Sequence, residues 1–300
     1  MTNEEYVDQL YRLLLRRAPE PAGREAAVTR LADGTVSRAT LVSELASSAE
    51  FERVRALDDA VARALQARKT DERPRNLTAP AGQDERPIEI AWTLARYRGE
   101  KRVLDVGYAN AERAYLAALR AAAPAAPAGA DLAEANVPGI DGVQADVRDL
   151  PFRRGSFDVV LCISTLEHVG KDNSLYGAGA ERDPAGIPQA LHELRRVLRR
   201  GGRLLVTVPT GENEDREWFV QRDARSWREL FLHAGFAVRE LELYELFDDG
   251  WRAVDEVTPG LRYGTRGPGA SAVLCAELRP GRVREILRRR ALGALRRGPA

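Results

Sequence analysis

Residues 103–111 read Val-Leu-Asp-Val-Gly-Tyr-Ala-Asn-Ala, a short apolar run that ends at Asp105 and Gly107. An apolar run of this length, closed by an acidic residue and a glycine, is typical of the first strand and turn of an open α/β sheet. Glycine suits such a turn because it lets the backbone approach a ligand closely. Three similar runs follow along the chain, namely GAD at 129–131, GVQAD at 142–146 and FDVVLCIS at 157–164.

Helical stretches separate these strands. We expect helices at 89–97, 111–122, 187–198 and 226–234, and later strands at 201–209, 235–246 and 271–278. Strands that alternate with helices at this spacing predict an open and mostly parallel α/β sheet. The last two strands have no long helix between them, which predicts a hairpin at one edge of the sheet.

The amino-acid composition and the net charge limit the classes of protein to which this chain can belong. The chain has 300 residues, of which 44% are hydrophobic and 30% are charged, so it has enough apolar material for a core. Its net charge of +1 gives no general attraction to nucleic acid. Its two cysteines, Cys162 and Cys275, both lie in strand-like runs, which argues against a disulfide framework. The N-terminus lacks the pattern of a signal peptide, so we expect a cytoplasmic protein.

The first 66 residues have a different pattern of apolar residues, without strand-like runs. Their apolar positions follow helical spacing, Pro19 and Gly34 mark breaks, and Ser37 is the expected N-cap of a third helix. We therefore expect three or four short helices packed as a small bundle. The expected organisation is a helical module at 1–66, a linker at 67–87, an α/β domain at 88–280 and a basic tail at 281–300.

The helical module carries a recognisable pattern. Residues 10–23 read LYRLLLRRAPEPAG, residues 37–45 read SRATLVSEL and residues 47–51 read SSAEF. This pattern resembles the domain of unknown function DUF4214, a helical module related to phycobilisome linker repeats. The resemblance implies a domain without catalytic residues that contacts a protein partner or a second copy of the chain.

Ligands of open α/β sheets bind beyond the carboxyl ends of the strands, where the strand order reverses. At such an end, the carboxylate of Asp131 can accept hydrogen bonds from ribose hydroxyls. Asp146 is placed to accept from an exocyclic amine, and Val147 to flank a flat ring.

Five motifs in order resemble the class I S-adenosylmethionine-dependent methyltransferases. They are VLDVG at 103–107, GADLAE at 129–134, QADVRDLPF at 144–152, FDVVLCISTLEHV at 157–169 and LHELRRVLRRGGRLLVTVP at 191–209. The resemblance implies a Rossmann-like fold with a seven-stranded, mostly parallel sheet, and S-adenosyl-L-methionine as the cofactor. The cofactor-binding residues that it implies are Asp105, Gly107, Tyr108, Asp131, Leu132, Asp146, Val147 and Ser164.

The chain departs from the family pattern in the turn after the first strand. The usual D-x-G-x-G-x-G has alanine here at Ala109 and Ala111. A Cβ adds bulk beside the cofactor and disfavours positive φ, so we expect weaker or altered cofactor binding. A catalytically inactive scaffold or cofactor-binding protein therefore stays open as the alternative function. A nucleotide-dependent oxidoreductase is disfavoured, because G-x-G-x-x-G is absent.

Methyl transfer from a sulfonium is an in-line displacement, and a hydroxyl acceptor benefits from a general base. His168, just after the fourth core strand, is the candidate base, and a packing or capping histidine is the alternative. The carboxylates and histidines are spaced too loosely to predict a metal site.

Two loops, 164–177 and 212–227, resemble a subgroup of methyltransferases that tailor sugars and cell-envelope polysaccharides. This resemblance implies O-methylation of a sugar or polysaccharide intermediate, with a small-molecule or glycan acceptor. The substrate candidates on these loops are Asp172, Tyr176, Trp218 and Asp223. A simpler interpretation of Trp218 is that it covers the core.

The C-terminal tail is strongly basic. Residues 279–297 contain eight arginines and one acidic residue, Glu285. Apolar residues at helical spacing permit a basic amphipathic helix, which would contact an anionic membrane surface. The alternative is a solvated helix at the end of the chain.

Overall fold

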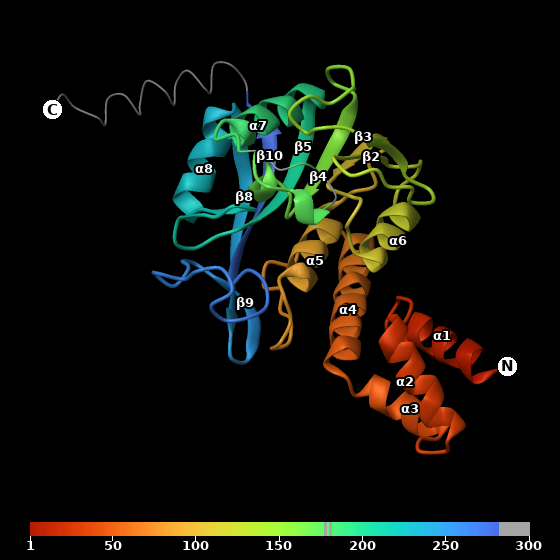
Figure 1. Cartoon of the computed structure of the whole chain (residues 1–300). Coiled ribbons are helices and arrows are strands. Elements are labelled where there is room, and N and C mark those ends of the chain that lie inside the picture. Colours follow the sequence, from red (N-terminus) through yellow and green to blue (C-terminus); the bar gives the residue numbers. More distant parts are fainter. Residues whose placement is uncertain (177–178, 180–181, 282–300) are drawn as a thin grey trace, which may run out of the picture.

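The computed structural model of the chain describes residues 1–176, 179 and 182–281 (Figure 1). Apart from Gly281, the basic tail at 281–300 lies outside the described residues. The amphipathic helix expected there falls on the same residues. Within the described part, no helix combines the length and the apolar character that crossing a membrane requires.

A central sheet forms the body of the molecule, with the strand order β3-β2-β1-β4-β5-β10-β8-β9. Its strands are β1 (Val103–Val106), β2 (Ala128–Asp131), β3 (Asp141–Gln144), β4 (Phe157–Ile163), β5 (Leu198–Pro209), β8 (Phe236–Phe247), β9 (Gly250–Val254) and β10 (Ala272–Pro280). The first five pair in parallel, and β10 pairs antiparallel with both β5 and β8. The predicted Rossmann-like α/β class is confirmed.

The sheet has eight strands where seven were expected. The additional strand, β9, pairs antiparallel with β8 through a tight turn in which Phe247 faces Gly250. Its five residues, GWRAV, are too few and too mixed in polarity to stand out in the sequence. Gly250 has φ +124°, and a Cβ there would overlap the carbonyl of Ala79. Ala79 and Trp251 form a bridge, so part of the segment expected to be a linker packs against this strand.

Eight α-helices are described. They are α1 (Asn3–Leu14), α2 (Pro21–Ala32), α3 (Arg38–Ala46), α4 (Ala49–Lys69), α5 (Arg86–Arg96), α6 (Arg113–Ala122), α7 (Gly186–Val197) and α8 (Ala224–His233). Figure 1 shows α4, α5 and α6 on one face of the sheet, and α7 and α8 on the other. Two separate apolar clusters fill these two faces, which gives the three-layer architecture of an α/β domain.

The first three helices have a small core of their own. Its buried residues are Val7, Leu10, Ala27, Val36 and Leu41. The Thr2 hydroxyl accepts from the amide of Glu5, and the Glu5 carboxylate accepts from the amide of Thr2, which makes a capping box. The Ser37 hydroxyl caps α3 by accepting from the Thr40 amide at 3.0 Å, as the sequence predicted.

Helix α4 connects the N-terminal helices to the sheet. Its 21 residues make it the longest helix described, and its buried Ala60 and Ala64 belong to the same apolar cluster as Trp92 of α5 and Leu119 of α6. Small side chains on this face let the neighbouring helices approach closely. The helix therefore packs on the α/β body as well as following the N-terminal module.

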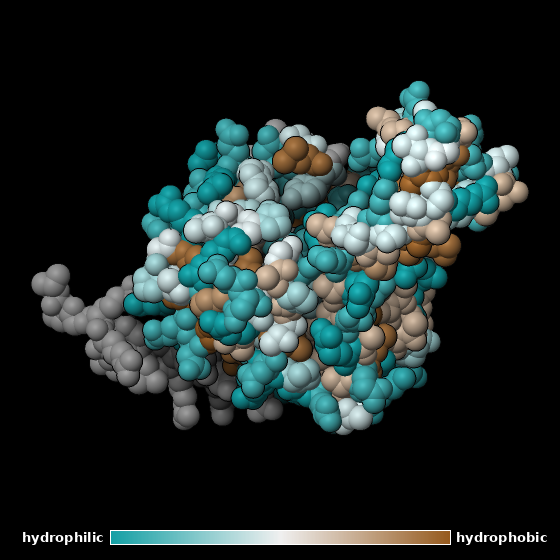
Figure 2. Space-filling model, turned by 90° about the horizontal axis from the view of Figure 1, so that it is seen from below, coloured by the Kyte–Doolittle hydropathy of each residue, from teal (hydrophilic) through white to brown (hydrophobic). Residues whose placement is uncertain are grey.

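Figure 2 shows the underside of the molecule, where hydrophilic and intermediate residues dominate and hydrophobic ones are scattered. Among the described residues, the large hydrophobic side chains that are exposed are Met1, Leu13, Leu132, Leu175 and Tyr176. Two of these, Leu132 and Tyr176, line the cavity described next.

Candidate active site

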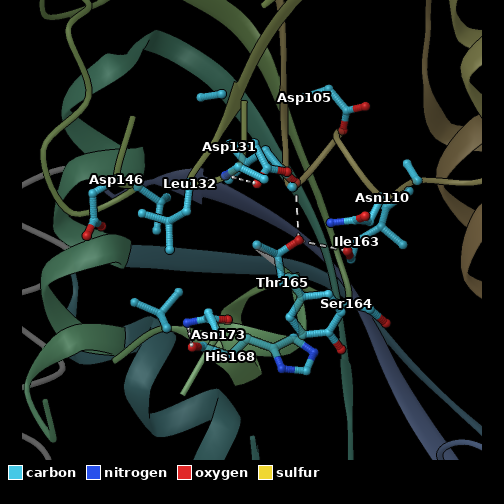
Figure 3. Close-up of a pocket in the computed structure, with 18 of the residues that line it drawn as sticks. Asp105, Asn110, Asp131, Leu132, Asp146, Ile163, Ser164, Thr165, His168 and Asn173 are labelled. Atoms are coloured by element: carbon cyan, nitrogen blue, oxygen red, sulfur yellow. Dashed lines mark hydrogen bonds between the residues drawn. The ribbon is translucent and has the colours of Figure 1, made fainter. Parts of the chain in front are cut away.

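A cavity of about 490 Å³ opens at the carboxyl ends of β1, β2 and β4 (Figure 3). The strand order reverses between β1 and β4, and ligands of open α/β sheets bind at such a point. The volume is in the usual range of small-molecule sites, roughly 300–1,000 Å³. In the view of Figure 3, Asp131, Leu132 and Asp146 lie across the cavity from Asn173 and His168.

Most of the predicted cofactor residues line this cavity. They are Asp105, Gly107, Asp131, Leu132, Asp146, Val147 and Ser164. Among the predicted catalytic and substrate residues, His168 and Tyr176 line it too.

Asp105, near the end of β1, is a buried carboxylate beside the cavity. Its Oδ2 atom has no hydrogen-bond partner within the described protein. Burial raises the pKa of Asp105 to about 7, although the neighbouring Tyr115 hydroxyl opposes the rise. A buried polar atom without a partner costs free energy, so Asp105 is suited to a polar group supplied by a ligand.

Gly107 forms the turn after β1 and has φ +83°. A Cβ at this position would overlap the side chain of Thr165, whose hydroxyl donates to the Ile163 carbonyl at 2.9 Å. Glycine is therefore required here both by the backbone conformation and by the space.

Asp131 is the last residue of β2, and its carboxylate binds the turn that follows β1. One carboxylate oxygen accepts from the Ala109 amide and the other from the Ala133 amide, both at 2.9 Å. Neither Ala109 nor Ala111 is among the residues with positive φ. Strain from a positive φ was expected at these two alanines. That strain is absent, because neither alanine has a positive φ in this turn.

Asp146 follows β3 and is held by Arg148. Its carboxylate accepts from the Arg148 amide at 2.8 Å and from Arg148 Nε at 3.0 Å, and Arg148 also binds Asp183 at 3.1 Å. Burial alone would raise the pKa of Asp146, but the hydrogen bonds from Arg148 outweigh it and lower that pKa. Asp146 is thus an ionised acceptor at the rim of the cavity.

His168 lies in the short 3-10 helix η1 (Leu166–His168). Its Nδ1 lies 2.7 Å from the carbonyl oxygen of Trp218, and its ring stacks on the Trp218 ring. Burial lowers the pKa of His168 to about 4, although the Trp218 carbonyl favours the charged form. The ring is therefore neutral near pH 7. Because a carbonyl only accepts, Nδ1 carries the proton, and Nε2 keeps its lone pair.

Tyr108, which the resemblance placed among the cofactor-binding residues, does not line the cavity. Its ring is buried and its hydroxyl donates to the Ala135 carbonyl at 2.8 Å. The ring fills the space beside Gly129 and Gly142 of β2 and β3, where a Cβ would overlap it. Tyr108 is thus a core residue next to the turn.

Three predicted substrate residues also lie outside the cavity lining. Asp172 accepts from the Ser174 amide at 2.9 Å and orders the short helix η2 (Ser174–Tyr176). Asp223 caps α8 by accepting from the Ser226 amide at 2.7 Å. Trp218 follows strand β6 (Glu214–Asp215) and precedes β7 (Val220–Gln221), and its ring packs on His168, Phe219 and Tyr263. The carbonyl and the ring of Trp218 therefore fix the orientation of the His168 ring.

Several lining residues were not predicted from the sequence. Among them are Arg86, Asn110, Glu112, Lys171 and Asn173. Arg86 begins α5, 17 positions before the first motif starts at Val103, and its guanidinium lies 3.4 Å from Glu89. Residues 86 and 87 belong to the segment expected to be a linker, although a proline at the first turn is typical of a helix start, and no local pattern showed that this helix borders the cavity. Lys171 and Asn173 lie in the loop from which Asp172 was chosen.

Comparison with known families agrees with this geometry. Residues 104–206 match the methyltransferase domain family, and residues 1–54 match a domain of unknown function, DUF4214. The first match runs from β1 to β5, and the second covers α1 to α3 and the start of α4.

Two curated relatives match part of the chain. An uncharacterised protein of Methanocaldococcus jannaschii is 30% identical over 115 residues, which is 37% of this chain and 37% of that protein. The phthiotriol/phenolphthiotriol dimycocerosates methyltransferase 1 of Mycobacterium ulcerans is 37% identical over 140 residues, 43% of this chain and 45% of that protein. The chain thus spans less than half the length of either relative.

Solved structures resemble the chain more distantly. One is a 1,6-didemethyltoxoflavin-N1-methyltransferase of Burkholderia thailandensis, with bound 1,6-didemethyltoxoflavin and S-adenosylhomocysteine. It is 15% identical, with a TM-score of 0.44, and the match covers 89% of this chain and 93% of that one. The family matches confirm both resemblances found in the sequence: residues 104–206 match the methyltransferase domain family, and residues 1–54, which precede them, match DUF4214.

Proposed function

We propose that this protein is an S-adenosylmethionine-dependent methyltransferase that methylates a hydroxyl group of a small molecule. A sugar or a cell-surface polysaccharide intermediate is the acceptor class we favour. The observation that carries the proposal is the cavity at the reversal of strand order, lined by Asp105, Gly107, Asp131 and Asp146 within a methyltransferase domain.

The residues present suit this cofactor. The unpartnered Oδ2 of Asp105 and the space at Gly107 are matched to a polar ligand that lies close to the turn. We assign the methionine portion to Asp105 and Gly107, with Arg86 as a cation for its carboxylate. Each Asp131 oxygen accepts one backbone amide and keeps a free lone pair for a ribose hydroxyl.

The adenine portion is assigned to the far end of the cavity. Asp146 is an ionised acceptor for an exocyclic amine, and the apolar side chains of Val147 and Leu132 can flank a flat ring. When bound, S-adenosylmethionine supplies a methyl group on a positively charged sulfur. The protein's contribution is to hold the acceptor oxygen in line with that methyl group.

His168 and Tyr176 are assigned to the acceptor. The free lone pair on His168 Nε2 can accept a hydrogen bond from a hydroxyl, since Nδ1–H is bound to Trp218. The Tyr176 ring lies edge-on to the His168 ring, with centroids 5.1 Å apart. The Mycobacterium ulcerans relative supports an oxygen acceptor, because its substrate is named as a triol derivative.

We further place the protein in the cytoplasm, with the basic residues of 281–300 against the anionic inner face of the membrane. The DUF4214 domain is assigned to contacts with a protein partner or a second copy of the chain. Neither assignment is needed for methyl transfer.

The test combines cofactor binding with a search for the acceptor. S-adenosylmethionine labelled in its methyl group is incubated with the protein and a panel of nucleotide sugars, glycans and lipid alcohols. Transfer of label to an oxygen atom supports the proposal. Transfer only to nitrogen or carboxylate acceptors would overturn the hydroxyl assignment, and a folded protein that binds no cofactor would overturn the whole proposal.

A further inference from the structure

Ser164 has a backbone conformation that is unusual for a residue other than glycine. It follows β4, lines the cavity and has φ +41°, a region that residues other than glycine rarely adopt. Such a conformation is strained and persists only where surrounding contacts enforce it. The contacts that do so are the Ser164 amide, which donates to the Thr207 carbonyl at 3.1 Å, and the Ser164 hydroxyl.

That hydroxyl binds a carboxylate with no access to solvent. Ser164 Oγ lies 2.7 Å from one oxygen of Glu89 and 2.8 Å from the other. Glu89 comes from α5, a neighbouring layer of the fold, and is 0% exposed. The strained turn therefore directs the hydroxyl of a residue that lines the cavity at a buried carboxylate behind the cavity wall.

The charged and titratable groups around Glu89 come from several elements. They are Asp84, Glu85 and Arg86 near the start of α5, Glu167 of η1 and Cys275 of β10, and the Thr207 hydroxyl of β5 also faces it. Burial raises the pKa of Glu89, while Arg86 and the hydroxyls of Ser164 and Thr207 oppose the rise. A carboxylate in this setting can hold a proton at a higher pH than an exposed one.

Ser164 has a single hydroxyl proton for two carboxylate oxygens. When Glu89 is ionised, that proton points to Glu89, and the oxygen lone pairs of Ser164 are free to accept from the cavity. When Glu89 is protonated, it can donate to Ser164, whose own proton is then free to point elsewhere. The state of Glu89 thus sets whether Ser164 accepts or donates.

We propose that Ser164 and Glu89 form a proton relay that takes the proton of the acceptor hydroxyl. The relay rests on the proposed function. The relay starts with Glu89 ionised, and the acceptor's proton passes to Ser164 Oγ as the serine proton passes to the Glu89 carboxylate. In the overall balance the acceptor oxygen exchanges its O–H bond for an O–CH₃ bond, the sulfonium sulfur keeps the electron pair of its broken bond, and Glu89 ends protonated.

His168 complements this relay. Its pKa of about 4 makes it a hydrogen-bond acceptor that orients the hydroxyl, and a weak holder of the proton at neutral pH. Ser164 is then a catalytic residue that touches the acceptor, and Glu89 is a positioning residue that acts through it.

The test compares Glu89→Gln and Ser164→Ala with Glu245→Gln. Glu245 is the matched control, because it is also buried and accepts from a hydroxyl, that of Thr258 at 2.6 Å, but it does not line the cavity or belong to the groups around Glu89. Turnover is measured against pH with an acceptor from the labelled-methyl search, and S-adenosylhomocysteine affinity is measured by calorimetry. We expect turnover to fall roughly 100-fold in E89Q and S164A, with loss of the acidic limb of the pH profile, and by less than about threefold in E245Q.

A second readout needs no acceptor. At a pH low enough to protonate Glu89, the infrared band of its carboxyl in the ligand-free protein should vanish in E89Q, shift in S164A and persist in E245Q. Wild-type turnover and pH profile in E89Q, with a carboxyl band that S164A leaves unmoved, would overturn the relay. Failure of the wild-type protein to bind S-adenosylhomocysteine would instead overturn the proposed function, while the infrared result would still decide whether the pair exists.

Discussion

At the scale of single residues, the turn after β1 depends on Gly107 and Asp131 together. Gly107 supplies a left-handed backbone with no side chain against Thr165, and Asp131 accepts the amides of Ala109 and Ala133. The turn is therefore shaped by hydrogen bonds to one carboxylate as much as by glycine. This explains how two alanines fit where the family pattern has glycine.

Gly107→Ala should disrupt both the fold of the turn and the binding of cofactor. Gly201→Ala is the matched control, because Gly201 has φ +79° but open space around a Cβ. Both variants carry a backbone strain of about 1–3 kcal/mol, and only G107A adds the overlap with Thr165. We expect S-adenosylhomocysteine affinity, measured by calorimetry, to fall by at least tenfold in G107A alone. Equal affinities in the two variants would contradict the assignment of Gly107.

Ala109→Gly should not improve cofactor binding. Ala109 is absent from the positive-φ residues, so glycine relieves no strain there and adds freedom to the unfolded chain. We expect unchanged affinity and a loss of about 0.4–1 kcal/mol in the free energy of unfolding, measured by denaturant titration. A markedly tighter complex without turnover would instead favour the inactive scaffold.

At the scale of elements, helix and strand periodicity predicted most of the architecture. Apolar runs and the residues at their ends located β1, β2 and β4, and with them Asp105, Asp131 and the cavity. The strand β9 was missed because its pairing depends on Ala79 and on β8, which are distant or antiparallel partners that local sequence does not reveal.

Local sequence does not show the direction of a side chain where that direction depends on packing. Tyr108 lies beside Gly107 in sequence but points into the space left by two glycines of other strands. The contact of Glu89 with Ser164 could not be predicted for the same reason, since only the fold brings α5 against Ser164. Asp223 carried a readable signal, because an aspartate three residues before Ser226 at the start of a helix is a typical N-cap.

Asp223→Ala tests this difference between capping and substrate binding. Loss of the cap of α8 should lower the free energy of unfolding by about 1 kcal/mol. Asp249→Ala is the comparison, because Asp249 makes an exposed ion pair with Arg252, and its loss should change stability by less than about 0.5 kcal/mol. S-adenosylhomocysteine affinity should match the wild type in both variants. An acceptor KM raised in D223A at unchanged stability would restore Asp223 to the substrate site.

At the scale of the whole molecule, buried carboxylates behind the cavity link stability to pH. The pKa of Asp105 is raised to about 7, above the value of about 3.9 for an unfolded chain. The folded state therefore binds more protons than the unfolded state between these two values. The contribution of Asp105 is most favourable at low pH, falls as pH rises through this window and is constant above it.

Asp105→Asn should flatten this dependence in the ligand-free protein. Asp105 alone contributes a slope of up to about 1.4 kcal/mol per pH unit between its two pKa values, and asparagine does not titrate. Denaturant titrations at several pH values within this window give the slope for each protein. The same slope in D105N and wild type would show that Asp105 ionises in the folded protein as it does when unfolded.

The central claim, that the cavity beside Asp105 and Gly107 binds S-adenosylmethionine, is tested most directly by calorimetric titration of the full chain. Both S-adenosylmethionine and S-adenosylhomocysteine are used, with G201A as the folded reference and G107A as the disrupted site. We predict one-to-one binding of both compounds in the micromolar range for wild type and G201A, and at least tenfold weaker binding for G107A. A folded wild-type protein that binds neither compound would contradict the account.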